Sequence, residues 1–297
     1  MKRITVSLIL AAAVIAISGC AKHAPAGAND ANKRYFDAWM EINHPEARPT
    51  ALGVYIIEDE PGTGEEVKKD GFARLDYITT DLEGNISAYT GEETAKQLGT
   101  YKSSNYYGPK FQTTIEGALP AGLAEALVGM KVGGHRKVII PSWLMSYKVY
   151  DSEEKYLAEK STTETTIYDF TVKGFTENIT DWEISQIGDY LKNNSDIYGN
   201  MTAADSTDVY GFYYKQLVEP TDTASFPKDT SIYINYTGKL LNGLVFDTTI
   251  EKVAKDNGIW SSTRTYEPTK INWGESYDKI TMGSSSTTTI SGFSRTL

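Results

Sequence analysis

Residues 236–248 read YTGKLLNGLVFDT, and this stretch decides the fold of the C-terminal part of the chain. Its Asn242-Gly243 dipeptide lies between two apolar-rich runs and is the strongest short hairpin signal in the sequence, because both residues tolerate the positive φ angles of a tight turn. Alternating residues at 231–236 predict the strand that leads into the hairpin, and Gly238 interrupts that strand. We therefore expect an antiparallel sheet at this end of the chain.

Short strand-like runs also dominate the N-terminal half of the chain. The expected strands, each an apolar or alternating run, cover residues 54–57, 72–77, 138–140 and 167–172. The only strong helical pattern among them is at 122–130, where Leu123, Ala126, Leu127 and Met130 share one face. The order of these elements restarts with the hairpin at 231–248, which indicates an internal duplication. The expected fold class is α+β, with tandem domains that each pack a curved antiparallel sheet on one short helix.

Two further segments show helical spacing outside these sheets. Residues 32–43 place Tyr35, Trp39 and Ile42 on one face, which predicts a short helix that caps the first domain. Residues 182–191 predict a second helix, which we interpret as the joint between the domains. The expected parts of the chain are a signal peptide at 1–19, a tether with a capping helix at 20–50, a first domain at 51–176, a helical linker at 177–208 and a second domain at 209–297.

Composition and charge exclude several functions. The chain has 297 residues with 29 basic and 39 acidic side chains, and loss of Lys2 and Arg3 with a leader would move the net charge from -10 to -12. Nucleic acid is therefore not an expected partner, because binding to it depends on clustered lysine and arginine. The scattered residues His23, His44 and His135 form no metal-ligand motif, so neither a metal nor a cofactor is expected.

The N-terminus predicts export and lipid attachment. Lys2 and Arg3 precede the apolar run 4–16, which is too short to span a membrane and is typical of a signal peptide. The following residues, Ile17-Ser18-Gly19-Cys20, resemble a bacterial lipobox, in which the chain is cut before the cysteine and the cysteine receives lipid. The alternative is an ordinary secretory leader with a chance cysteine. We expect a protein anchored through Cys20 in the cell envelope, at the outer membrane and facing the periplasm, because no acidic surface-export tag follows Cys20.

The hairpin residues 236–248 resemble the Tyr-Thr-Gly hairpin of FKBP-type peptidyl-prolyl cis-trans isomerases, including the Phe-Asp pair after the turn. Residues 211–215 are similar to the opening strand of that family, and 290–293 are similar to the segment that enters its single helix. The first domain resembles the same family less closely from 54 to about 175. There, Ser87 and Ala88 stand where the Phe-Asp pair should be and Leu123 replaces the aromatic floor, so the resemblance implies a degenerate first pocket.

The resemblance implies a site in the second domain. Tyr236, Phe246, Ile290 and Phe293 would enclose a proline ring, the Ile290 backbone N–H would hold a substrate carbonyl, and Asp247 would orient a polar contact at the rim. As alternatives, Phe246 and Phe293 could be core residues and Asp247 a turn residue, while Ile271 and Trp273 could line the cavity or pack beneath it.

These resemblances imply a peptidyl-prolyl cis-trans isomerase that acts on proline-containing exported polypeptides. The alternative is a noncatalytic FKBP-like binding or chaperone lipoprotein, and a surface lipoprotein that binds nutrients is a weaker third reading. Family members continue beyond Leu297 through further strands, so we expect a C-terminally incomplete second domain, either because the sequence is a fragment or because a natural truncation has silenced the site.

Overall fold

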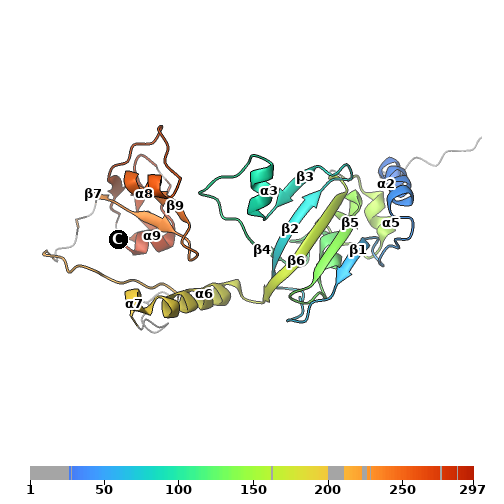
Figure 1. Cartoon of the computed structure of the whole chain (residues 1–297), viewed down its shortest axis with the longest axis horizontal. Coiled ribbons are helices and arrows are strands. Elements are labelled where there is room, and N and C mark those ends of the chain that lie inside the picture. The colour runs from blue at the N-terminus through green and yellow to red at the C-terminus, as the bar shows by residue number, and fades with distance from the viewer. Residues whose placement is uncertain are drawn as a thin grey trace, which may run out of the picture.

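The computed structural model describes residues 27, 29–161, 163–199, 211–222, 226–227, 229–274, 276–285 and 287–297, so the expected leader and Cys20 lie outside the described residues. Two lobes lie side by side and are joined by helix α6 (Figure 1). The first lobe contains a six-stranded sheet, and the second contains a three-stranded and a two-stranded sheet. All strand pairs in both lobes are antiparallel, as the sequence predicts.

The large sheet confirms the four strands expected in the first half. Its strands are β1 (Tyr55–Glu60), β2 (Phe72–Thr80), β3 (Ile86–Tyr89), β4 (Lys110–Thr113), β5 (His135–Ile140) and β6 (Thr166–Thr176). They run in the order β1-β5-β6-β2-β3, and β4 also pairs with β2. The longest pairing joins β2 to β6, from Phe72 opposite Thr176 to Thr80 opposite Ile167.

Helix α4 (Ala121–Leu127) packs on this sheet and buries Leu123 and Leu127 in the core. Gly122 allows the close approach, because a Cβ atom there would lie 2.4 Å from Ile140 Cγ2. The expected helix at 122–130 is therefore confirmed, although it ends at Leu127.

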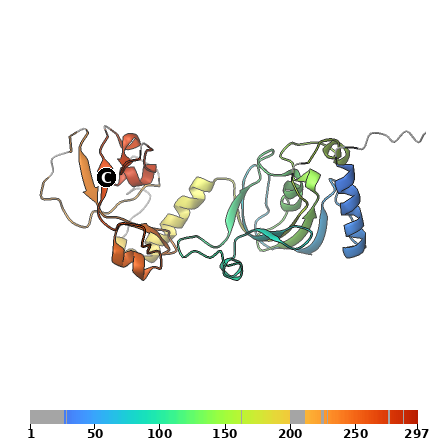
Figure 2. The same cartoon turned by 90° about the horizontal axis from the view of Figure 1, so that it is seen from above.

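Helix α2 (Asp30–Asn43) caps the first lobe, as expected (Figure 2), but its buried face is centred on other residues than those predicted. Phe36 and Met40 are buried, and the Phe36 ring lies edge-on to Trp143 with 5.6 Å between ring centroids. Tyr35 and Ile42 are 56% and 79% exposed, so Trp39 is the one member of the predicted stripe that packs against the core. Both faces have helical spacing, and only the position of the sheet decides between them.

The expectation of one helix per sheet is wrong for the first lobe. The lobe also contains α3 (Glu92–Gln97), α5 (Glu153–Ala158) and the 3-10 helix η1 (Ser142–Leu144). Helices α3 and α5 are six residues long and each buries a single side chain, Ala95 and Tyr156. Such short, mostly polar helices carry no hydrophobic period that a sequence pattern can show.

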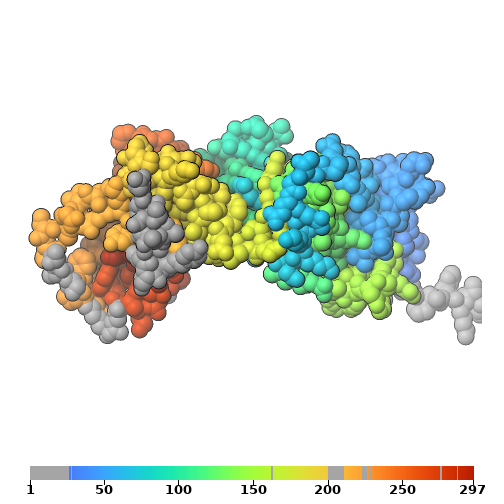
Figure 3. Space-filling model, turned by 90° about the horizontal axis from the view of Figure 1, so that it is seen from below, coloured from blue at the N-terminus to red at the C-terminus, as the bar shows by residue number. Residues whose placement is uncertain are grey.

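The structure confirms the helix predicted at 182–191. Helix α6 (Ile179–Asn193) is capped by the Asn178 side chain, which accepts hydrogen bonds from two backbone N–H groups, and α7 (Ser195–Tyr198) follows it. Figure 3 shows α6 in yellow across the lower face between the lobes. The strand expected at 211–215 is absent from the described residues there, because this segment lies against α6 and α7 instead: Lys215 Nζ donates to the Ile197 carbonyl at 2.6 Å.

The second lobe is built around the predicted hairpin. Its elements are β7 (Ser231–Ile234), β8 (Thr237–Lys239), β9 (Val245–Thr248), α8 (Glu251–Asp256), β10 (Thr269–Asn272), η3 (Tyr277–Lys279), β11 (Thr281–Met282) and α9 (Ser291–Arg295). Strands β8 and β9 pair directly, and Gly243 at the turn has a φ angle of +88°. The hairpin is therefore confirmed.

The two lobes also meet away from the linker. The loop after α3 reaches the second lobe, where Ser103 Oγ donates a hydrogen bond of 2.6 Å to the Gly258 carbonyl. Among the described residues, no helix is long and apolar enough to cross a membrane.

Candidate functional site

One segment of the first lobe is repeated in the second without a gap. Residues 77–113 align with 236–272 at a constant separation of 159 positions, and eleven of the 37 aligned pairs are identical. Both segments run strand, turn, strand, short helix, loop and strand. Gly84 and Gly243, at the same place in the two turns, both have a φ angle of +88°.

The hydrogen bonds of the two segments also correspond. The Tyr77 backbone N–H donates to Thr90 Oγ1 at 2.9 Å, and the Tyr236 backbone N–H donates to Thr249 Oγ1 at 3.0 Å. In the loops that follow, the hydroxyl oxygens of Tyr107 and Tyr266 accept from backbone N–H groups at 2.9 and 3.0 Å. The repeat is therefore structural as well as sequential.

A lysine packs over an aromatic ring in both copies. Lys96 pairs with Glu92 at 2.9 Å and lies 5.5 Å from the centre of the Tyr101 ring. At the equivalent place, Lys255 pairs with Glu251 at 2.7 Å and lies 5.5 Å from the centre of the Trp260 ring. Both ion pairs are exposed to solvent, so we interpret them as surface features.

Three of the five predicted site residues lie together in the second lobe. The Tyr236 hydroxyl, at the β7–β8 junction, donates to Asp247 Oδ2 at 2.5 Å. The Tyr236 ring lies edge-on to Phe293 of α9, with 5.4 Å between centroids and 76° between planes. The hairpin and helix α9 thus each contribute one aromatic side chain to this group.

Asp247 is held by two partners. Arg264, in the loop after α8, donates to its second carboxylate oxygen. Burial opposes ionisation of Asp247, but the hydrogen bonds from Tyr236 and Arg264 outweigh it and lower the pKa of this carboxyl below its ordinary value. Burial raises the pKa of the Tyr236 hydroxyl, and the hydrogen bond to Asp247 adds to this effect. The carboxylate is therefore ionised and fixed in direction at neutral pH.

The other two predicted residues stand at the exposed edge of this group. The Phe246 side chain is 46% exposed and packs across Gly238, and among the described residues it makes no ring contact with Phe293. Ile290 is 77% exposed and caps α9, where its carbonyl accepts from Ser294 N at 3.0 Å. The Ile290 backbone N–H donates to no partner in the described part of the lobe, so it is available to an incoming carbonyl.

Neither Ile271 nor Trp273 belongs to this group, and Trp273 lines a separate cavity of about 440 Å³ in the second lobe. Ile271 is fully buried in β10, and Trp273 lies edge-on to Phe226 at 5.5 Å. Arg264 is a candidate site residue that sequence reasoning missed, because its only signal is a basic side chain in the loop that follows α8.

The equivalent place in the first lobe has different chemistry. Ser87, where the second lobe has Phe246, shares a hydrogen bond of 2.9 Å with Thr79, and Leu123 is buried where the second lobe has Phe293. The Tyr77 ring lies 6.4 Å from that of Tyr168 in β6. Burial, together with neighbouring tyrosines, raises the pKa of Tyr168 to about 12. Ser87 and Ala88 therefore replace the phenylalanine ring and the carboxylate of the second lobe.

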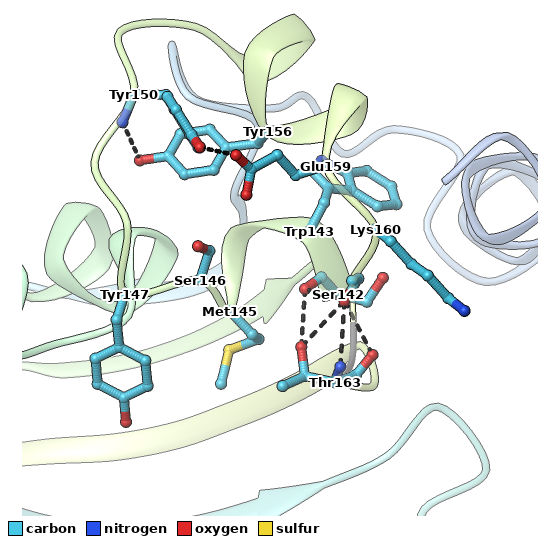
Figure 4. A pocket seen from close by; sticks show the side chains of 11 residues that line it. Ser142, Trp143, Met145, Ser146, Tyr147, Tyr150, Tyr156, Glu159, Lys160 and Thr163 are labelled. Atoms are coloured by element: carbon cyan, nitrogen blue, oxygen red, sulfur yellow. Dashed lines mark hydrogen bonds between the residues drawn. The ribbon is translucent and has the colours of Figure 1, made fainter. Parts of the chain in front are cut away.

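A separate cavity of about 290 Å³ lies between η1 and α5 (Figure 4). Its polar wall includes Glu159, which accepts hydrogen bonds from Tyr150 and Lys148. The Thr163 hydroxyl donates to the Ser142 carbonyl at 2.9 Å. None of the five predicted site residues lines this cavity. The described residues also contain no cluster of three or more potential metal ligands, so the structure offers no candidate metal centre in the part of the chain that it covers.

Comparisons with known proteins agree on one family. The family model of the FKBP-type peptidyl-prolyl cis-trans isomerase matches residues 67–173. A short-type peptidyl-prolyl cis-trans isomerase from Methanocaldococcus jannaschii is 33% identical over 75 residues, which are 25% of this chain and 47% of that protein. The chain therefore spans about half the length of this curated relative.

Solved structures of similar proteins were also found. A peptidyl-prolyl cis-trans isomerase from Pseudomonas syringae is 18% identical with a TM-score of 0.35, covering 52% of this chain and 98% of its own. FkpA from Escherichia coli is 20% identical with a TM-score of 0.33, covering 59% of this chain and 72% of its own. The matched residues 67–173 contain strands β2 to β6 up to Lys173 and helix α4. This part of the chain is an FKBP-type peptidyl-prolyl cis-trans isomerase domain.

Proposed function

We propose that this chain is a peptidyl-prolyl cis-trans isomerase whose working pocket lies in a second FKBP-like domain, the lobe at 229–297. One observation carries the proposal: the two lobes share the segment described above, but only the second sets a tyrosine, a phenylalanine and an ionised carboxylate around one spot. Tyr236, Asp247 and Phe293 form this group, and Phe246 and Ile290 stand beside it.

Such a group suits the reaction because the reaction needs no nucleophile. Rotation about an Xaa-Pro bond must break amide resonance and meets a barrier of about 18–20 kcal/mol. A protein lowers the barrier by binding the twisted imide better than either planar form. The twisted imide has less charge separation than the planar one, so an apolar, aromatic wall favours it over water.

The polar groups would hold the chain on either side of the proline. The Ile290 N–H, which donates to no partner among the described residues, can bind a substrate carbonyl. Asp247 can accept a hydrogen bond at the rim without moving, because Tyr236 and Arg264 fix its direction. Preorganised groups of this kind cost no rearrangement when the bond rotates.

A noncatalytic role is favoured for the first lobe. Ser87, Ala88 and Leu123 replace the groups that would form the aromatic pocket there, and the hydroxyl of Ser87 is engaged by Thr79. We propose that this domain supports polypeptide substrates without isomerising them and without binding a prolyl residue beside Tyr77 and Tyr168.

We further propose that the substrates are exported polypeptides and that the protein is anchored by lipid at Cys20 on the periplasmic face of the outer membrane. The support is the leader and the motif Ile17-Ser18-Gly19-Cys20. Labelling of producing cells with a fatty acid tests this: label on the wild type and its loss in Cys20→Ser supports the anchor, whereas equal labelling of both, or of neither, contradicts it.

The catalytic proposal is tested with a proline-containing peptide and the full chain. The variant with Phe246→Ala and Asp247→Ala is expected to lose most of the acceleration, and a control variant with Ser87→Ala at the equivalent position of the first lobe is expected to retain it. Equal rates for the wild type and the double variant would remove the pocket from the mechanism.

A further inference from the structure

Two positions that face each other across the hairpin differ between the lobes in a coordinated way. In the first lobe they are Thr79 and Ser87, and in the second, 159 residues later, they are Gly238 and Phe246. The strand register is the same in both: Thr79 pairs with Ala88 and Gly238 pairs with Asp247. The two pairs therefore occupy one structural place.

Each lobe fills this place by different means. In the first lobe Thr79 is buried and its hydroxyl lies 2.9 Å from that of Ser87. In the second lobe a Cβ atom on Gly238 would lie 2.5 Å from Cζ and 2.6 Å from Cε2 of Phe246. Real Cβ atoms essentially never approach other atoms below 3.0 Å, so the Phe246 ring occupies the volume of the missing side chain.

Backbone conformation does not explain the glycine. The φ angle of Gly238 is outside the left-handed region, unlike that of Gly243 in the adjacent turn at +88°. Other residues can adopt the backbone of Gly238, and what they cannot do is leave room for the ring. A glycine inside a strand commonly marks such a close approach, and a cross-strand aromatic ring shields the backbone that the glycine exposes.

We propose that Gly238 is a positioning residue of the second-lobe site: it seats the Phe246 ring beside Asp247, and the choice between Gly-Phe and Thr-Ser at these two positions decides which lobe presents an aromatic wall. This inference rests on the proposed function for its catalytic consequence, but its structural part stands on the packing alone. The ring is rigid, so any side chain at position 238 must displace the whole of it rather than bend its end.

The packing of the Phe246 ring on Gly238 is tested on the wild-type chain by NMR, without a variant at position 238. A ring that lies on Gly238 shifts the glycine Hα resonances upfield, and Phe246→Leu is expected to return them to the ordinary glycine range. Ordinary Hα positions in the wild type, or upfield positions that survive Phe246→Leu, would overturn the inference.

The coupling between the two positions is tested by a double-mutant cycle in urea unfolding with Gly238→Thr, Phe246→Ser and the combination. The combination reproduces the Thr-Ser pair of the first lobe, so it is expected to recover stability that Gly238→Thr alone loses. If Gly238→Thr does not fold, Gly238→Ala replaces it in the cycle, because it adds only a methyl group to the space that the Phe246 ring occupies. Additive effects in the cycle would contradict a direct packing contact between positions 238 and 246.

The catalytic consequence is measured with the proline-peptide assay. Gly238→Ala is expected to lower kcat/KM by between about 10- and 100-fold, because a shift of about one ångström in a positioned group costs this much. Thr79→Gly in the first lobe is the control and is expected to leave the rate unchanged. If Gly238→Ala keeps the wild-type rate while the rate still depends on Phe246, the positioning role is wrong. If even the wild type gives no acceleration, the proposed function fails. The NMR shifts and the double-mutant cycle still test whether the Phe246 ring packs on Gly238.

Discussion

Replacing Tyr236 by phenylalanine tests the electrostatic part of the site most simply, because it removes one hydroxyl and leaves the ring on Phe293. The lost hydrogen bond of 2.5 Å ends on the ionised Asp247. Hydrogen bonds to charged groups contribute about 1.5–3 kcal/mol when buried. The Asp247 side chain is 33% exposed, so solvent weakens this bond, and we expect a loss of about 1 kcal/mol in the free energy of unfolding.

The loss must depend on pH in a defined direction. The bonds from Tyr236 and Arg264 lower the pKa of Asp247 in the folded state. Their contribution is therefore fully present above the ordinary carboxyl pKa of about 3.9, and it disappears as the pH falls through the lower folded-state value. The difference between wild type and Tyr236→Phe is expected to be largest near neutral pH and to shrink as the pH falls through the lowered folded-state pKa of Asp247.

Urea unfolding of both proteins across this pH range measures the effect, and Arg264→Gln in the same series shows how far the second partner shares it. The two variants share one carboxylate, so their effects are expected to be non-additive. A pH-independent difference, or a difference that grows as the pH falls, would refute the assignment of the hydroxyl to an ionised Asp247.

Other variants test the fold in opposite directions. Leu127→Ala opens a cavity in the first core and is expected to cost about 3 kcal/mol in urea unfolding; a cost under about 1 kcal/mol would contradict the packing of α4. Asn29→Ala removes the buried amide that donates to the Leu157 carbonyl at 3.2 Å and accepts from Ser161 N at 3.1 Å, so thermal unfolding should show a loss of about 1–3 kcal/mol. Gly243→Ala forces a left-handed residue and should cost about 1–2 kcal/mol, whereas Gly188→Ala meets open space inside α6 and should stabilise by up to about 1 kcal/mol. Changes of the same sign in the free energy of unfolding for the two glycine variants would contradict the turn geometry.

Local signals explain the parts of the fold that sequence reasoning predicted. Asn242-Gly243 requires a turn whatever surrounds it, and Leu123 and Leu127 form a face that only a helix on a sheet can bury. Tyr236 and Asp247 are separated by the hairpin, so its register alone brings them together. These features depend on neighbours in the chain.

Features that depend on distant parts of the chain were not predictable in the same way. Tyr35 and Phe36 both lie on plausible faces of α2, and the sheet on which the helix packs selects Phe36. The aromatic residues at 211–215 have the composition of a strand, but they lie against the linker helices. Arg264 reaches Asp247 only because the loop after α8 folds back across β9.

The central claim is that a prolyl peptide binds in the second lobe and not in the first. Titration of the labelled full chain with a short proline-containing peptide, followed by NMR, measures this directly. We expect shifts that centre on Tyr236, Phe293 and the Ile290 N–H, with the resonances of Tyr77 and Tyr168 little changed. Shifts that centre on Tyr77 and Tyr168 instead would contradict it, and would place the working pocket in the first lobe.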